Sequence, residues 1–471
     1  MTADSTNLHF HGLSIPPTCH QDESLNTQVQ PADSAFEYQF RIPVTQTPGL
    51  YWYHPHIHGN SEAQVLGGAS GAVIVEKPET EPTQEEHKAG KGSEPGKSAA
   101  NERTTKESES AKDSPTKPPN PFLPERILVI RDQNPAPDAE PGHPAKDLSV
   151  NFIPVPYPDY PMAILRTRPS RREFWRVLNA CADTYLDLGV LFNGKWRQLG
   201  LVAVDGAPLG RSPSHIDAIS WQTDIPIPPG GRAEFILDTP AEHVDAELLT
   251  LGVDTSPPND EDNPRTRTAT STTPVPESDD ANPPRQLVKI IASTDADETP
   301  TQAALPEPTP AMDLARAKPV RQRQFYFSEK VLDPQHPASS TVYYITEQGA
   351  KPAAFHLAAA PNVTVHSGDV EDWIIENRSQ ESHAFHIHQL HFLTLQRDGA
   401  ATKEAYLRDT IDVPYWDGTS PQFPSVTLRM DFRDPNIVGK FPYHCHVLQH
   451  SDAGMMGVIE VKPKLQKSAK K

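Results

Sequence analysis

Residues 443–456 read YHCHVLQHSDAGMM, and the order of His, Cys and Met in this stretch decides the fold and the chemistry that the sequence predicts. On an extended strand, residues i and i+2 point to the same face. His444 and His446 would therefore face one way, and Cys445 would face the other. A strand of this kind can present one group of metal ligands on each of its faces.

Three further segments repeat the His-x-His spacing: TNLHFHGL at residues 6–13, GLYWYHPHIHG at 49–59 and HAFHIHQLHF at 383–392. One such pair alone is more often structural than a metal site, but four pairs together favour metal binding. Eight imidazoles exceed the four ligands that a zinc ion takes, which predicts a cluster of several metals. The pairs are His9 and His11, His54 and His56, His386 and His388, and His444 and His446.

A second metal site is predicted on the far face of the last strand. Cys445 would supply a thiolate there, and His383, His450 and the thioether of Met455 stand at compatible spacings. Two His and one Cys with a weak axial Met form the ligand set of blue-copper electron-transfer sites. Because Cys445 is covalently adjacent to two histidines of the cluster, electrons would have a short path between the two sites.

The rest of the chain predicts short strands and no long helix. The alternation of Phe36, Tyr38, Phe40 and Ile42 with polar residues predicts a half-buried strand, and residues 363–377 predict two strands around a Ser-Gly-Asp turn. Many short strands with turn signals are typical of all-β sandwiches and barrels. Buried strands are also predicted at residues 71–76, 126–131, 233–238, 286–292 and 457–461.

Length and composition predict several domains with polar insertions. The chain has 471 residues, which suits about three cores. Proline is frequent, at 51 residues, and residues 77–120 contain no Val, Ile, Leu, Met or aromatic residue. Such a segment cannot bury enough surface to offset its ordering entropy, so it is predicted to be a disordered linker. Residues 255–285 and 294–310 are predicted to be disordered or loop insertions, which leaves domains at 1–76, 121–293 and 311–465.

Charge, hydropathy and cysteine content exclude other classes of protein. The formal net charge of −19 argues against a nucleic-acid partner, because phosphate binding needs clustered Lys and Arg. No stretch approaches the ~18 apolar residues of a membrane span. Three cysteines do not make a disulfide framework, although a bond between Cys19 and Cys181 stays open. The oligomeric state is open as well.

The four histidine segments closely resemble the copper motifs of multicopper oxidases, in particular the bacterial laccase-like group that includes copper-efflux oxidases and spore-coat laccases. The resemblance covers most of residues 5–76 and 361–461 and is weaker in the middle, where EFWRVLN at 173–179 and VDG at 204–206 carry it. It implies an all-β fold of three cupredoxin-like Greek-key domains that bind four copper ions. The type 1 copper would be held by His383, Cys445, His450 and axial Met455, the type 2 copper by His9 and His386, and the two type 3 coppers by His11, His54 and His446 and by His56, His388 and His444.

The resemblance also implies that carboxylates near the cluster deliver protons. Asp22 stands where an acid near the type 2 copper is expected. Bacterial members often have Glu directly after the second type 1 histidine, but here that position is Ser451, and Asp452 follows. We therefore expect Asp22 to be the catalytic acid, with Asp452 as the weaker candidate.

The first predicted domain looks incomplete. Two strands precede the histidine motif in the third block, whereas the first motif begins at His9, so comparable strands are missing. Their absence would expose an apolar face and a strand edge. We favour a true start upstream of Met1, with a signal peptide lost as well, over a genuinely shortened protein. The family resemblance implies export to the periplasm or the medium.

The expected function is a laccase-like oxidase that takes electrons from phenolic or similar small molecules and reduces dioxygen to water. One alternative is a metallo-oxidase for Mn(II), Fe(II) or Cu(I). The presence of only six Met and no Met-rich insertion weakens the Cu(I) alternative and leaves Mn(II) and Fe(II) open. Another is a copper-binding protein with little turnover, if the first domain is truly short. Copper nitrite reductase fits poorly, because that enzyme lacks a His-Cys-His segment with flanking type 3 ligands.

Overall fold

The computed structural model describes residues 4–33, 35–77, 122–135, 144–155, 157, 162–210, 219–257, 282–297, 301–307, 312–336 and 340–464. Strands dominate these residues, which confirms the all-β prediction. No helix in the described part of the chain is long and apolar enough to cross a membrane. The helices there are short: α1 (Ser61–Leu66), α2 (Met312–Arg316), the 3-10 turn η3 (Pro435–Ile437) and α4 (Leu448–Asp452).

The first region, residues 4–77, forms one antiparallel sheet with the order β1-β2-β3 among its described residues. Its strands are β1 (His9–His11), β2 (Gly49–His54) and β3 (Gly71–Val75). Side chains alternate along β2, since Tyr51 packs with Phe10 in the first region's own core while Leu50 and Trp52 pack on the middle region. The strand predicted at Phe36–Ile42 is wrong: Tyr38 and Phe40 pack on that core, but residues 35–43 form no strand.

The middle region, residues 122–307, contains two sheets in its described parts. Their inner faces enclose an apolar core that includes Leu128, Trp175, Phe235 and Leu248. The larger sheet contains β4 (Phe122–Gln133), β5 (Asp147–Val150), β6 (Ile153–Val155), β8 (Arg172–Asn179), β11 (Leu199–Val204), β12 (Ala207–Pro208), β13 (Ser220–Gln222), β15 (Arg232–Asp238) and β18 (Gln302–Ala304). The smaller sheet contains β7 (Ala163–Thr167), β9 (Leu186–Phe192), β10 (Lys195–Trp196), β14 (Asp224–Ile227), β16 (Ala246–Thr250) and β17 (Arg285–Ala292).

The third region, residues 312–464, also contains two described sheets around one core, which includes Phe325, Trp373 and Phe385. One sheet contains β19 (Arg321–Val331), β20 (Thr341–Glu347), β22 (Val370–Asn377), β24 (Phe392–Arg397), β25 (Ala400–Ala401), β26 (Leu407–Arg408) and β28 (Ser425–Asp431). The other contains β21 (Val363–His366), β23 (His383–Ile387), β27 (Thr410–Val413), β29 (Gly439–Cys445) and β30 (Met456–Lys462). The two strands predicted around the Ser-Gly-Asp turn are confirmed as β21 and β22.

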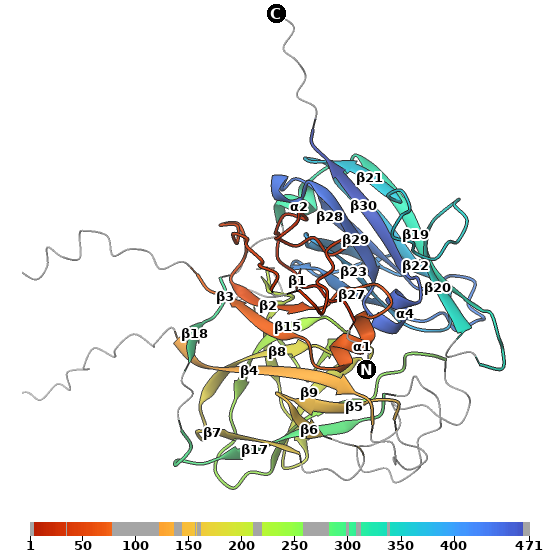
Figure 1. The fold of residues 1–471 in the computed structure, drawn as a ribbon. Coiled ribbons are helices and arrows are strands. Elements are labelled where there is room, and N and C mark those ends of the chain that lie inside the picture. Colours follow the sequence, from red (N-terminus) through yellow and green to blue (C-terminus); the bar gives the residue numbers. More distant parts are fainter. Residues whose placement is uncertain are drawn as a thin grey trace, which may run out of the picture.

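The three regions meet around the first sheet. In Figure 1 the red and orange strands β1 to β3 lie between the blue third region and the yellow and green middle region. β2 contacts β8 and β15 of the middle region, and α1 contacts α4 of the third region. We propose that these regions are the three predicted domains, with the middle one extended past residue 293 by β18.

The predicted insertions have mixed outcomes. Residues 78–120 and 258–281 lie outside the described residues. The prediction for 294–310 is wrong in part, because β18 pairs antiparallel with the start of β4. The physical reason is apolar contact: Ala303 and Leu305 pack against the small core of Phe174, Val202 and Ile236.

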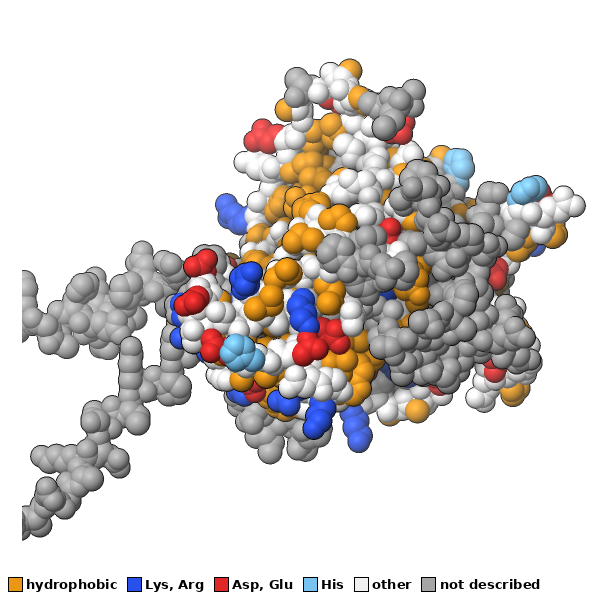
Figure 2. Space-filling model, turned by 90° about the horizontal axis from the view of Figure 1, so that it is seen from below, with side chains coloured by type: hydrophobic (Ala, Val, Ile, Leu, Met, Phe, Trp, Pro, Cys, Tyr) orange, Lys and Arg blue, Asp and Glu red, His pale blue; other side chains and the backbone are white. Residues whose placement is uncertain are grey.

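One face of the molecule is rich in exposed hydrophobic side chains. Figure 2 views the molecule from below and shows them gathered along the middle of that face. Exposed large hydrophobic residues of the middle region include Phe152, Ile153 and Ile164. In Figure 1 β6 and β7 lie at the opposite end of the molecule from β21, well away from the histidine-bearing strands.

Candidate metal centre

Two neighbouring strands of the third region set the geometry of the centre. β23 pairs antiparallel with β29, with His386 opposite His444 and Phe385 opposite Cys445. Directly opposed residues share a face of the sheet. The two histidines therefore face one side, while Cys445 faces the apolar core of the third region. The prediction that Cys445 and its histidine neighbours serve opposite faces is confirmed.

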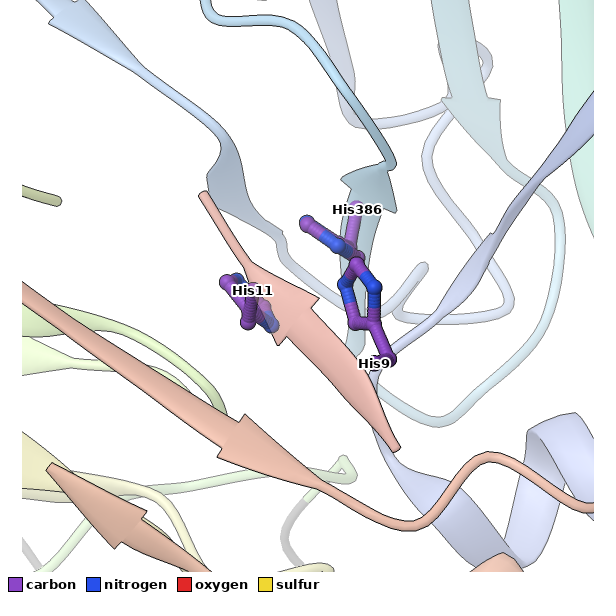
Figure 3. Close-up of side chains that lie close together, drawn as sticks. All are labelled: His9, His11 and His386. Carbon is purple, nitrogen blue, oxygen red and sulfur yellow. The ribbon is translucent and has the colours of Figure 1, made fainter. Parts of the chain in front are cut away.

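The first sheet brings its own histidines against that strand pair. Within the sheet, His9 lies opposite His54. Figure 3 shows His9 and His11 on β1 beside His386 on β23, although these strands are far apart in the sequence. The rings of His11 and His386 stack with centroids 3.8 Å apart, and those of His9 and His388 stack at 3.5 Å. Histidine rings of the first region thus stack directly on histidine rings of the third region.

Two of the histidine groups have the members of the implied type 3 sets, and a third adds His11 to the implied type 2 pair of His9 and His386. Within each group, one potential ligand atom per residue lies within 4.8 Å of the others, and all of these residues are buried. The four His-x-His pairs therefore converge in the structure, and their role as copper ligands stays a prediction. The groups are His9, His11 and His386; His11, His54 and His446; and His56, His388 and His444.

The unpaired ring nitrogens fit a metal cluster. Buried polar atoms normally have a hydrogen-bond partner, and lone ones carry a desolvation cost. Among the described residues, the nitrogens without a partner include Nε2 of His9, His54 and His386 and Nδ1 of His11. In the third group, Nε2 of His444 lies 3.2 Å from Nε2 of His56 and 3.3 Å from that of His388. The lone pairs of nitrogens that converge in this way can bind metal cations placed between them.

The opposite nitrogen of most rings is held by an acceptor, which fixes the tautomer. His54 Nδ1 donates to Pro55 O at 2.9 Å, His386 Nδ1 to Asp409 O at 2.9 Å and His444 Nδ1 to Cys445 O at 2.8 Å. An N–H anchored on one side leaves the other nitrogen free for a metal, as in known metal sites.

Burial keeps these rings neutral, which is the form that binds metals. It lowers the pKa of His444 to about 4. Burial is also the main cause that lowers the pKa of His11, His54, His56, His386, His388 and His446.

The predicted type 1 residues form a separate buried group on the far face of β29. Cys445 Sγ lies 3.6 Å from His383 Nδ1 and 3.8 Å from His450 Nδ1. The two Nδ1 atoms are 3.0 Å apart. Met455 is buried beside them, and its backbone bonds to both Cys445 N and His450 O. The set of thiolate and imidazoles suits copper.

The two predicted acids occupy different places. Asp22 is fully buried, and its carboxylate oxygens both lie 3.1 Å from His9 Nδ1. It also accepts hydrogen bonds from Phe10 N and Gln389 Nε2. Asp452 lies at the end of α4, where it accepts from Gly59 N at 2.8 Å and Glu62 N at 2.9 Å, and burial raises its pKa to about 6. Of these two acids, Asp22 contacts a histidine of the centre, and Asp452 contacts the backbone beside the second motif.

Sequence reasoning missed a buried ion pair behind the cluster. Asp409 Oδ1 lies 2.9 Å from His11 Nε2, and Arg232 of the middle region donates to both Asp409 oxygens at 2.7 and 2.6 Å. Burial alone would raise the pKa of Asp409, but the Arg232 guanidinium holds it below its usual value. Arg232 also donates to Leu50 O of the first sheet. No local pattern marks these two residues, because they are distant in sequence.

Two further residues were missed for the same reason. Glu381 Oε2 lies 3.0 Å from His450 Nε2. Gly230 has a positive φ of 81° and lies against the His446 ring, where a Cβ atom would be 2.7 Å from Cε1. The only sequence signal at this place is the Pro-Gly-Gly turn at residues 229–231, which does not reveal what the turn contacts.

The three cysteines are all free thiols, so Cys19 and Cys181 are not bonded to each other.

Comparison with known proteins agrees with this geometry. Multicopper oxidase family models match residues 1–80 and 327–465. A laccase from Bacillus subtilis is 23% identical over 477 residues, which span 97% of this chain and 79% of the laccase.

Solved structures support the cupredoxin-like fold. A multicopper oxidase from Campylobacter jejuni, described as a metallo-oxidase, aligns with a TM-score of 0.62 at 22% identity and covers 98% of this chain and 80% of its own. The McoA multicopper oxidase from Aquifex aeolicus aligns with a TM-score of 0.62 at 18% identity and covers 98% and 85%.

Proposed function

Because this chain belongs to the multicopper oxidase family of copper oxidoreductases, we propose that it is a laccase-like enzyme that couples one-electron oxidation of phenolic or similar donors to reduction of dioxygen to water. The observation that carries the proposal is the arrangement of three consecutive residues at the end of β29. Cys445 belongs to one buried ligand group, and its neighbours His444 and His446 belong to two other groups. An electron that enters at the thiolate has only covalent bonds to cross before it reaches a cluster histidine.

The donor atoms suit four copper ions. We propose that His383, Cys445, His450 and Met455 would hold the type 1 copper, and that His9 and His386 would hold the type 2 copper. The two type 3 coppers would be held by His11, His54 and His446, and by His56, His388 and His444. When bound, these ions supply one-electron oxidation at the type 1 site and four-electron reduction of dioxygen to two waters at the cluster.

The chain's own residues keep these two sites apart and dry. The cluster histidines are at most 4% exposed, and Trp52 stacks on His54 with ring centroids 4.3 Å apart. We propose that Asp22 passes protons toward the cluster, since its carboxylate contacts the far nitrogen of His9. Asp452 is the second candidate. It reaches the second motif only through the amides of Gly59 and Glu62.

A metallo-oxidase is the second candidate function, because a solved structure that aligns over 98% of this chain is described as one. The donor would then be a reduced metal ion, and the dioxygen chemistry would be the same. Export from the cytoplasm remains a prediction from the family resemblance.

Copper counting combined with oxygen uptake tests the proposal. We expect the reconstituted chain to bind four copper ions, to show the blue type 1 band and to consume dioxygen with a phenol. Uptake with Mn(II) and not with the phenol would favour the metallo-oxidase. Fewer than four coppers without uptake would contradict both and favour a copper-binding protein. Cys445→Ser should remove the blue band and one copper and abolish rapid uptake, while three coppers stay bound.

A further inference from the structure

One histidine of the first region lies beyond the strand ladder that holds the others. His9 and His54 are opposite each other in the ladder of β1 and β2, and β2 ends at His54. Pro55 follows and has no N–H to donate. His56 comes next and is 4% exposed. Because a buried backbone N–H is costly to leave unpaired, another group has to hold the His56 backbone.

The side chain of Asn7 supplies that group. Asn7 lies two positions before His9 and is 1% exposed. Its Oδ1 accepts a hydrogen bond from His56 N at 2.7 Å, and its Nδ2 lies 3.5 Å from His56 O. The amide thus meets both backbone groups of His56, as a residue of a neighbouring strand does in a ladder.

The same amide also holds a neighbouring loop against the cluster. Its Nδ2 donates to Ser24 O at 3.2 Å and to Thr27 O at 3.1 Å. The Ser24 hydroxyl is buried and lies 3.4 Å from His388 Nδ1. His388 Nε2 faces His444 Nε2 at 3.3 Å, so Nδ1 is the outer nitrogen of this ring. The loop therefore contacts the side of His388 that points away from the metal.

The two histidines that Asn7 reaches belong to one ligand group. That group is His56, His388 and His444. His388 resembles His56 in its position, because β23 ends at Ile387, one residue before it. In the described structure, the printed bonds of Asn7 reach no member of the other type 3 group. The amide therefore supports one half of the type 3 pair.

We propose that Asn7 is a positioning residue for one type 3 copper: its side-chain amide orients His56 directly and His388 through the loop of Ser24. The inference rests on the proposed function, because it requires copper between His56, His388 and His444. It predicts that the two type 3 sites can be separated by a single substitution that leaves every ligand in place.

Asn7→Leu keeps the size of the side chain and removes all of these bonds. We expect the folded variant to bind three coppers in place of four and to keep the blue band. Two type 3 cupric ions with paired spins give no electron paramagnetic resonance signal, but a single one does. The signal should therefore grow by one copper per chain while total copper falls by one. Four coppers with an unchanged signal would overturn the proposal.

Gln64→Leu is the matched control, because Gln64 also tethers the start of the chain through a side-chain amide. Its Nε2 donates to Ser5 O at 2.9 Å, and its Oε1 accepts from Thr6 Oγ1 at 2.7 Å. This variant loosens the residues just before Asn7 without touching His56 and should keep four coppers. If it loses the same copper as Asn7→Leu, general loosening of the chain start explains both results and the proposal fails.

Ser24→Ala tests the contact with His388 in a variant that keeps the loop backbone. Partners of the outer nitrogen of a metal-bound histidine typically change metal affinity about 10–100-fold. We expect one copper of Ser24→Ala to leave at a chelator concentration about tenfold lower than in wild type. An unchanged release profile would overturn the part of the proposal that concerns His388.

Hydrogen exchange in the copper-free chain gives a test that needs no bound metal. The His56 N–H lies outside any strand, yet its bond to Asn7 Oδ1 should protect it in wild type. Its exchange should be about tenfold faster in Asn7→Leu. Rapid exchange of this amide in wild type would refute the proposal. Failure of the proposed function has a different signature, namely a protected His56 amide in a wild-type chain that binds fewer than four coppers.

Discussion

The type 1 group and the histidine cluster are built in opposite ways, although they share β29. All four type 1 residues belong to the third region and lie in or beside one core. The cluster instead combines His9, His11, His54 and His56 of the first region with four histidines of the third. The first group forms when one region folds, whereas the second forms only when two regions dock.

The docking of the first region depends on buried polar contacts as well as apolar packing. The Arg232 guanidinium bonds to Leu50 O of the first sheet and to both oxygens of Asp409, which in turn contacts His11. Asp22 of the first region bonds to Gln389 of the third. Buried polar contacts of this kind hold the first region in one orientation. If one partner of such a contact is removed, the other partner stays buried without compensation. We therefore expect damage to the interface to empty the cluster before it empties the type 1 site.

The variant with the largest expected effect on this difference is Arg232→Met. The change leaves the Asp409 carboxylate buried without its counter-ion, and removing one partner of a buried pair costs about 3–5 kcal/mol. We expect the folded fraction to fall and the cluster to lose copper, while chains that remain folded keep the blue type 1 band. Copper counting and the optical spectrum of the purified variant measure both effects.

An exposed ion pair in the same region provides the control for that variant. Arg172 pairs with Asp238 at 2.8 Å, and both side chains are about half exposed. Exposed pairs contribute at most about 1 kcal/mol, so Arg172→Met should retain full copper occupancy. Equal loss of both kinds of copper in Arg232→Met would show that the two sites fold as one unit.

A second test uses pH at the junction of α1 and α4. Burial raises the pKa of Asp452 from 3.8 to about 6. The folded chain binds this proton more tightly than the unfolded chain, so the group stabilises the fold fully below pH 3.8 and loses that contribution as pH rises through about 6. The difference corresponds to about 3 kcal/mol. Asp452→Asn should therefore gain stability relative to wild type as pH rises from 4 to 8.

Urea unfolding of the copper-free chain at several pH values measures this gain without interference from copper release. Glu242→Gln provides a surface control, because this carboxyl is exposed and its pKa is lowered instead of raised. A parallel pH dependence in wild type and Asp452→Asn would mean that Asp452 is solvated at this junction. The contact between α1 and α4 would then contribute little to docking.

The features that could be predicted from the sequence are those that depend on local periodicity. The i and i+2 rule places His444 and His446 against Cys445 correctly, because strand pleating requires only neighbouring residues. It fails at Phe36–Ile42, where Tyr38 and Phe40 use the alternating pattern to pack on Phe10 without a strand ladder. Alternation of apolar and polar residues predicts which side chains are buried. A strand also needs a hydrogen-bonding partner, which the pattern does not predict.

The residues that hold the ligands could not be predicted, because their partners lie far along the chain. Arg232 and Asp409 are 177 positions apart, and Asp409 and His11 are 398 apart. The sequence around Asp409, which lies between β26 and β27, gives no sign of the arginine that neutralises its charge. Asp22 was found only because the family resemblance assigns an acid near that position.

The smallest test concerns a glycine behind His446. Gly230→Ala places a Cβ atom 2.7 Å from the His446 ring at a residue with φ +81°, so the ring has to move. Gly194 has a similar φ of +70°, but nothing lies within 4 Å of its Cβ position. The backbone cost of about 1–2 kcal/mol should be common to both variants, because it depends on φ alone. Only Gly230→Ala should also lose type 3 copper, measured as copper per chain and as oxygen uptake, with the blue band retained. If both variants keep all their copper, the middle region does not position His446, and the cluster depends on the first and third regions alone.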